Sequence, residues 1–92
     1  MNGWDFEQSE YWYQINPELI KFDGDYNGIR CLFGVSVSAI NNAFGDYDSR
    51  ENAEEQFESN MEFFHNLAVE AAYGNEPESE DFDEPPFYFI NI

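Results

Sequence analysis

A periodic run of apolar residues constrains the fold more than any other feature of this sequence. Between residues 53 and 71 the apolar positions are spaced by 4, 4, 3, 4 and 3 residues, the period of a helix with one buried face. We therefore predict one long helix that begins after Asp48 or Ser49 and ends near Gly74, a residue suited to a left-handed C-terminal cap. The apolar positions of this stripe are Ala53, Phe57, Met61, Phe64, Ala68 and Ala71.

The residues before this helix predict strands and a second, shorter helix. Segments 10–15 and 18–23 are rich in strand-favouring residues, and 28–35 places apolar side chains on alternate positions. Because turn formers, including an Asn-Gly pair, separate the last two segments, we predict an antiparallel hairpin. Ser36 is placed to cap a short helix over 37–44, which Gly45 ends.

The two ends of the chain complete the predicted architecture. Residues 1–9 are expected to form an irregular or partly docked arm, and residues 75–86 an acidic loop that holds three of the four prolines. The terminal run FYFINI is typical of a strand. We predict one domain over 1–92 of the α+β class: a small antiparallel sheet, made of the hairpin and the C-terminal strand, with a short and a long helix packed on one face.

Charge narrows the possible functions. The chain has 20 Asp or Glu residues against 3 Lys or Arg, a formal net charge of -17. Such a chain repels phosphates, so we expect neither direct nucleic-acid binding nor attachment to an anionic membrane. Disorder is not expected despite this charge, because 42% of the residues are hydrophobic and 20% are aromatic.

The residue types that catalysis and metal binding use are scarce. Cys31 is the one cysteine, on an apolar strand face, and His65 is the one histidine, beside the helical stripe, so we predict structural roles for both. We expect no enzyme activity and no cofactor. The N-terminus lacks a basic segment followed by an apolar run, and a cytoplasmic location is expected.

One motif resembles the opening of a calcium-binding loop. Asp23, Asp25, Asn27 and Gly28 match the first positions of an EF-hand, but Gly34 occupies the twelfth position, where a bidentate glutamate is required. The flanking segments are also strand-like. A plain hairpin turn is therefore the predicted structure, with a weak calcium site as the alternative and no other metal site expected.

The distribution of the carboxylates points to a binding surface. Glu51, Glu55, Glu58 and Glu62 are spaced by 4, 3 and 4 residues on the predicted long helix, and no lysine relieves the repulsion between them. Carboxylates one turn apart lie about 5–6 Å from each other, which is comparable with the spacing of neighbouring phosphates. A solvated helix face is the alternative. The predicted partner-binding residues are Asp46, Asp48, Glu51, Glu54, Glu55, Glu58, Glu62, Glu76, Glu78, Glu80, Asp81, Asp83 and Glu84.

In size, charge and the acidic helix from Glu51 to Glu62, the chain resembles the small nucleic-acid-mimic inhibitors of phages and mobile elements, of the anti-CRISPR and anti-restriction type. This resemblance implies an inhibitor that mimics nucleic-acid phosphates in the host cytoplasm. Its partner would be a basic nucleic-acid-binding protein, such as a CRISPR effector, a restriction enzyme or another nuclease. The exposed aromatic anchors expected at that contact are Tyr47, Phe82 and Tyr88.

A second resemblance covers more of the chain. The segments NGIRC at 27–31 and AINNAFG at 39–45, the pair Phe57 and Asn60, and the terminal FYFINI are similar to a family of short uncharacterised bacterial proteins. That family implies the same hairpin, two helices and closing strand, and assigns no activity. Two other functions remain open: an immunity or antitoxin-type inhibitor of a nuclease, and a non-catalytic structural or regulatory subunit that binds a basic protein.

Overall fold

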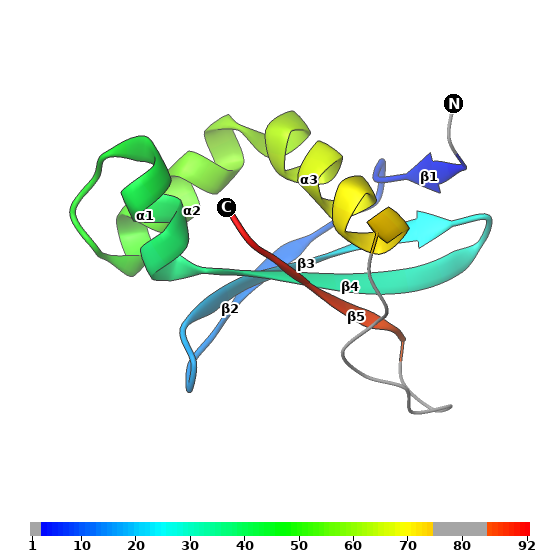
Figure 1. The fold of residues 1–92 in the computed structure, drawn as a ribbon, viewed down its shortest axis with the longest axis horizontal. Coiled ribbons are helices and arrows are strands. Elements are labelled where there is room, and N and C mark those ends of the chain that lie inside the picture. Colours follow the sequence, from blue (N-terminus) through cyan, green and yellow to red (C-terminus); the bar gives the residue numbers. More distant parts are fainter. Residues whose placement is uncertain (1–2, 75–84) are drawn as a thin grey trace.

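The computed structural model describes residues 3–74 and 85–92, which form a sheet covered on one face by helices (Figure 1). This arrangement confirms the predicted α+β class. The strands are β1 (Trp4–Asp5), β2 (Tyr11–Gln14), β3 (Leu19–Tyr26), β4 (Ile29–Ser36) and β5 (Phe87–Ile90). The helices are α1 (Val37–Phe44), α2 (Arg50–Ser59) and α3 (Met61–Gly74).

The predicted hairpin forms the centre of the sheet. Strands β3 and β4 pair antiparallel up to Tyr26 and Ile29, and the two residues between them, Asn27 and Gly28, have φ angles of 50° and 87°. Positive φ at both central residues is the requirement of the tight turn that matches strand twist. The Asn-Gly pair therefore sets the register of the hairpin, as the sequence predicts.

The C-terminal strand pairs with β4, but in parallel, so the sheet is mixed rather than wholly antiparallel. The strand order is β1-β3-β4-β5, and β2 also pairs with β3. Between β4 and β5 the chain passes through the helix layer. A crossover connection of this kind returns to the sheet so that the next strand runs in the same direction as the one before it. The helical crossover therefore explains the parallel pairing.

The predicted long helix is divided in two at Asn60. This residue leaves the helical conformation, with φ at −132°, and its side-chain amide donates a hydrogen bond to the carbonyl of Gln56 at 2.9 Å. Asparagine side chains compete in this way with backbone hydrogen bonding in helices. Ser49, one of the two predicted starting points, caps α2 by accepting from the backbone N–H of Asn52 at 3.1 Å.

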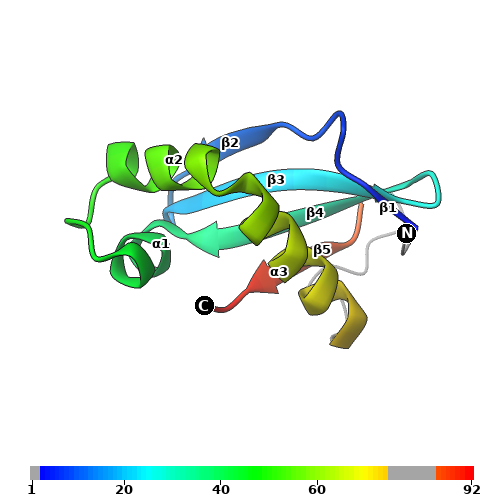
Figure 2. The same cartoon turned by 90° about the horizontal axis from the view of Figure 1, so that it is seen from above.

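Aromatic rings fill the space between the helices and the sheet. Phe57 of α2 is fully buried and packs against Phe22 of β3 and Phe64 of α3, with ring centroids 5.1 and 5.0 Å apart. The apolar stripe thus faces the core on both sides of the break. Figure 2 shows α2 near one end of the sheet and α3 crossing toward β5.

The N-terminal arm is attached to the sheet. Trp4 and Asp5 pair with β3, and the ring of Phe6 lies over Gly24, where an added Cβ would be 2.3 Å from that ring. Phe6 also stacks on His65 with ring centroids 4.2 Å apart. Because glycine has no side chain, position 24 leaves room for the ring of Phe6 to pack against the core.

In the described part of the chain, no helix combines the length and apolar character needed to cross a membrane.

Candidate functional site

The described part of the predicted acidic surface lies largely on α2 and on the loop that precedes it. Six of its thirteen residues, Glu76, Glu78, Glu80, Asp81, Asp83 and Glu84, lie outside the described residues. The other seven are Asp46, Asp48, Glu51, Glu54, Glu55, Glu58 and Glu62. The structure divides these seven into carboxylates that have a hydrogen-bond or ion-pair partner among the described residues and carboxylates that have none there.

Two of the partnered carboxylates hold the loop between α1 and α2. Asp46 accepts a hydrogen bond from the side-chain amide of Gln56 at 2.7 Å, and Asp48 accepts from the hydroxyl of Ser38 at 2.9 Å. Buried Asn41 donates to the carbonyl of Ser49 at 2.8 Å in the same loop. Asp46 and Asp48 therefore have a structural role, which the sequence pattern did not reveal.

Two more carboxylates connect α2 with its surroundings. Glu54 accepts from Nε of Arg50 at 3.1 Å, one turn earlier in the helix. Glu58 accepts from the hydroxyl of Tyr11 on β2. This hydrogen bond, followed by partial burial and the charge of Glu58, raises the pKa of Tyr11 to about 12.

Five of the seven residues are exposed, and two of them, Asp48 and Glu58, have the partners described above. The other three are Glu51 and Glu55 on α2, and Glu62 at the start of α3. Their side chains have no hydrogen bond or ion pair within residues 3–74 and 85–92. The column predicted from Glu51 to Glu62 is not continuous, because the break at Asn60 places Glu62 on another helix. The part of the column that is regular runs from Glu51 through Glu55 to Glu58.

The expected aromatic anchors have different environments. Tyr47 is 91% exposed in the acidic loop between Asp46 and Asp48, where it is available to a partner. Tyr88 is half-buried and stacks on Phe33, with ring centroids 5.8 Å apart, so its prediction as an exposed anchor is wrong. Phe82 lies outside the described residues.

Cys31 and His65 lie in apolar surroundings. Burial raises the pKa of the Cys31 thiol, and burial lowers the pKa of the His65 imidazole. The thiol faces the carbonyl of Ile29 at 3.8 Å, whereas the imidazole stacks on Phe6. Both groups are thus held neutral, which favours the predicted structural roles over activation of a nucleophile.

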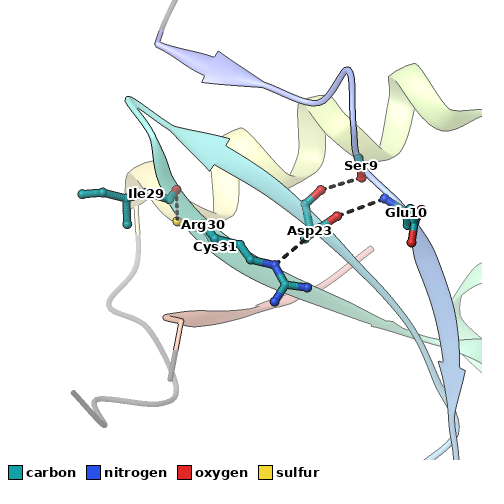
Figure 3. A network of polar contacts seen from close by, with 6 residues as sticks. All are labelled: Ser9, Glu10, Asp23, Ile29, Arg30 and Cys31. Atoms are coloured by element: carbon teal, nitrogen blue, oxygen red, sulfur yellow. Dashed lines mark hydrogen bonds and ion pairs between the residues drawn. The ribbon is translucent and has the colours of Figure 1, made fainter. Parts of the chain in front are cut away.

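The Asp23–Gly28 motif belongs to the hairpin. Figure 3 shows the carboxylate of Asp23 between Nε of Arg30, at 3.1 Å, and the backbone N–H of Glu10, at 3.0 Å. Its backbone carbonyl accepts from the hydroxyl of Ser9. Asp23 therefore fixes the start of β2 to the hairpin, in agreement with the predicted turn. In the described ranges, no three His, Cys, Asp or Glu residues are placed to hold a metal ion together.

The segment that contains the three helices has an uneven charge. Residues 37–74 hold eight Asp or Glu residues against one arginine, Arg50, which stacks over the ring of Tyr13 at 4.1 Å. Such a segment produces a strong negative potential over the helix layer. The chain matches no protein-family model, no curated protein and no solved structure.

Proposed function

We propose that this protein is a non-enzymatic inhibitor that mimics nucleic-acid phosphates and occupies the basic DNA- or RNA-binding site of a host defence protein. The observation that carries the proposal is the group of exposed glutamates that have no partner among residues 3–74 and 85–92. Glu51, Glu55 and Glu62 have no hydrogen-bond or ion-pair partner within the described residues, and Glu51 and Glu55 repel each other across one turn of α2. In the proposed complex, Arg and Lys side chains of the partner pair with these carboxylates and relieve the repulsion between them.

The mechanism has two stages. The negative potential over the helix layer first steers a basic protein toward this face, which raises the association rate. Glu51 and Glu55, one helical turn apart, then pair with arginines or lysines that normally contact neighbouring phosphates. Tyr47, exposed beside them, adds an aromatic contact of the kind that anchors interfaces.

The partnered carboxylates support this surface without taking part in it directly. Asp46 and Asp48 fix the loop that holds Tyr47, and Glu58 fixes α2 to β2. A rigid support lowers the entropy cost of binding, because the exposed glutamates are already placed on a fixed helix. The same surface would also serve an immunity or antitoxin-type inhibitor of one nuclease, because the nucleic-acid-binding site of a nuclease is basic as well.

The test is capture of proteins from a bacterial lysate at low salt by the immobilised full chain, followed by elution with duplex DNA. The proposal expects basic nucleic-acid-binding proteins that duplex DNA and added salt both displace. Captured proteins that DNA leaves in place would refute mimicry and favour a structural or regulatory subunit. Failure to capture any protein from lysates that contain restriction and CRISPR systems would also count against the proposal.

A further inference from the structure

A cavity lies between the C-terminal part of α3 and the face of the sheet that the helices cover. Its volume is about 280 Å³, and four of the residues that line it are aromatic: Trp4 of β1, Tyr26 of β3, Tyr73 of α3 and Tyr88 of β5. The smallest ligand pockets have about 300 Å³, so this cavity suits one small molecule. It lies at the end of the sheet away from α2 (Figures 1 and 2).

Packing against the core holds the rings on the sheet side of the cavity. Trp4 and Tyr26 are partners in the strand register, and their ring centroids are 5.1 Å apart with 44° between the ring planes. Tyr88 stacks on the fully buried Phe33, and Trp4 contacts Phe33 with ring centroids 5.6 Å apart. Because these rings are already held in place, a ligand would bind without ordering them first, which lowers the entropy cost.

The exposure of the lining residues shows where the cavity opens to solvent. Tyr73 is 92% exposed and Tyr26 is 42% exposed, so these two form the rim, whereas Cys31 is 5% exposed and forms the floor. The other lining residues on α3 are Val69 and Ala72. Among the described residues that line the cavity, none is Asp, Glu, Lys, Arg or His. A ligand therefore has to present apolar surface to this lining.

The charges around the cavity favour a cation. Burial, followed by the charge of Asp25, raises the pKa of the Cys31 thiol, so this carboxylate acts on the cavity floor. The carboxylate of Asp25 has no hydrogen bond or ion pair among residues 3–74 and 85–92, and Arg30, its neighbour in the strand register, pairs with Asp23. In a chain with a net charge of -17, an anionic ligand would be repelled here and a cation attracted.

We propose that this cavity binds a small organic cation with an alkylated ammonium group. The methyl groups of such a cation match the apolar lining, and its charge is attracted to the faces of Trp and Tyr rings. A hard metal ion requires several oxygen ligands, whereas this lining consists mainly of aromatic and aliphatic carbon. A neutral apolar molecule would fill the same space without the attraction of its charge to the rings. The inference goes beyond the proposed function and does not rest on it.

The test is titration of the full chain with choline, followed by the fluorescence of Trp4. The chain has two tryptophans, so Trp12, which does not line the cavity, is changed to Phe and Trp4 remains as the reporter. Neohexyl alcohol, the uncharged carbon isostere of choline, and sodium chloride are titrated in parallel. We expect a saturable change with choline and a dissociation constant at least about tenfold lower than that of the isostere. A response to choline that does not saturate, or that the isostere or sodium chloride reproduces, would overturn the proposal.

Two equally exposed tyrosines provide matched variants. Tyr73→Ala removes a ring from the cavity rim and Tyr47→Ala removes one from the acidic loop, and because the two side chains are 92% and 91% exposed, neither change disturbs the core. We expect Tyr73→Ala to raise the dissociation constant for choline by about two- to fivefold, the contribution of one exposed ring. Tyr73→Phe, which keeps the ring, and Tyr47→Ala should bind choline as the parent chain does. An unchanged constant in Tyr73→Ala, or an equal rise in Tyr47→Ala, would overturn the assignment of the site.

Discussion

Neutralising Glu55 should make the protein more stable. Glu55 has Glu51 four residues before it and Glu58 three residues after it on α2, and its own carboxylate has no partner within the described residues. Like charges at these spacings destabilise a helix by about 0.2–0.5 kcal/mol per pair, so Glu55→Gln should gain about 0.4–1 kcal/mol. Glutamine and glutamate have similar helix propensities, so this gain is electrostatic.

The assay is thermal and urea unfolding at neutral pH, in low salt and in about 1 M salt, where the Debye length is about 3 Å. The gain corresponds to a rise in melting temperature of roughly 2–8 °C for a domain of this size. High salt should remove the difference between the variant and the wild type. A loss of stability in Glu55→Gln, or a gain that persists in high salt, would refute the claim that repulsion from Glu51 and Glu58 destabilises the helix at Glu55.

The matched control is Glu54→Gln in the same helix. This change also relieves repulsion, because Glu51 lies three residues before Glu54 and Glu58 four residues after it, but it removes the ion pair with Arg50 at 3.1 Å. The lost ion pair offsets roughly half of the relief from two repulsive pairs, so we expect a smaller gain in stability than in Glu55→Gln. A gain equal to that of Glu55→Gln would mean that the Arg50 pair contributes nothing.

Three further predictions concern the core and the response to pH. Phe57→Ala should cost about 3–5 kcal/mol in urea unfolding, because Phe57 is fully buried among aromatic rings; a cost typical of a surface site would contradict its place in the core. Burial lowers the pKa of His65 below 6.5 in the folded protein. As the pH falls below 6.5, the imidazole is therefore protonated more readily in the unfolded chain than in the folded one, and the folded state loses stability. His65→Phe should show a smaller loss than the wild type between pH 7 and pH ~5, and parallel profiles would refute this role. The pKa of Tyr11 is raised from 10.0 to about 12, so stability is lost as pH rises through that interval, and Tyr11→Phe should flatten the loss seen in urea unfolding.

The local features of the fold were predictable from the sequence. The Asn27–Gly28 pair specifies a tight hairpin by its φ angles, and Ser36 and Gly45 delimit α1 as expected. The direction of β5 was not predictable, because it depends on the path of the chain through three helices rather than on the residues of the strand. The break at Asn60 was also missed, since the apolar spacing continues through it and the competing hydrogen bond to Gln56 leaves no periodic signal.

The acidic surface was predictable in outline but not in detail. The spacing of Glu51 and Glu55 indicates an exposed column, and both side chains are exposed. The partner of Glu58 is Tyr11, which is 47 residues away in the sequence, and no local pattern indicates such a contact. The roles of Asp46 and Asp48 depend in the same way on how α1 and α2 pack.

The central claim is that the exposed glutamates near α2 bind a basic partner, and one comparison tests it most directly. The variant with Glu51, Glu55 and Glu62 changed to Gln is compared with a control in which Asp5, Glu7 and Asp25 become Asn, Gln and Asn. Both lose three negative charges, but β1 lies at the opposite end of the molecule from α2 (Figures 1 and 2).

Each immobilised variant is used to capture proteins from the same lysate at low salt, and the amount that duplex DNA elutes is measured. The account predicts that the control retains most of the wild-type capture and that the glutamate variant loses most of it. Equal losses in the two variants would mean that net charge alone attracts the partner. Equal retention in both would contradict the assignment of the binding surface to these glutamates.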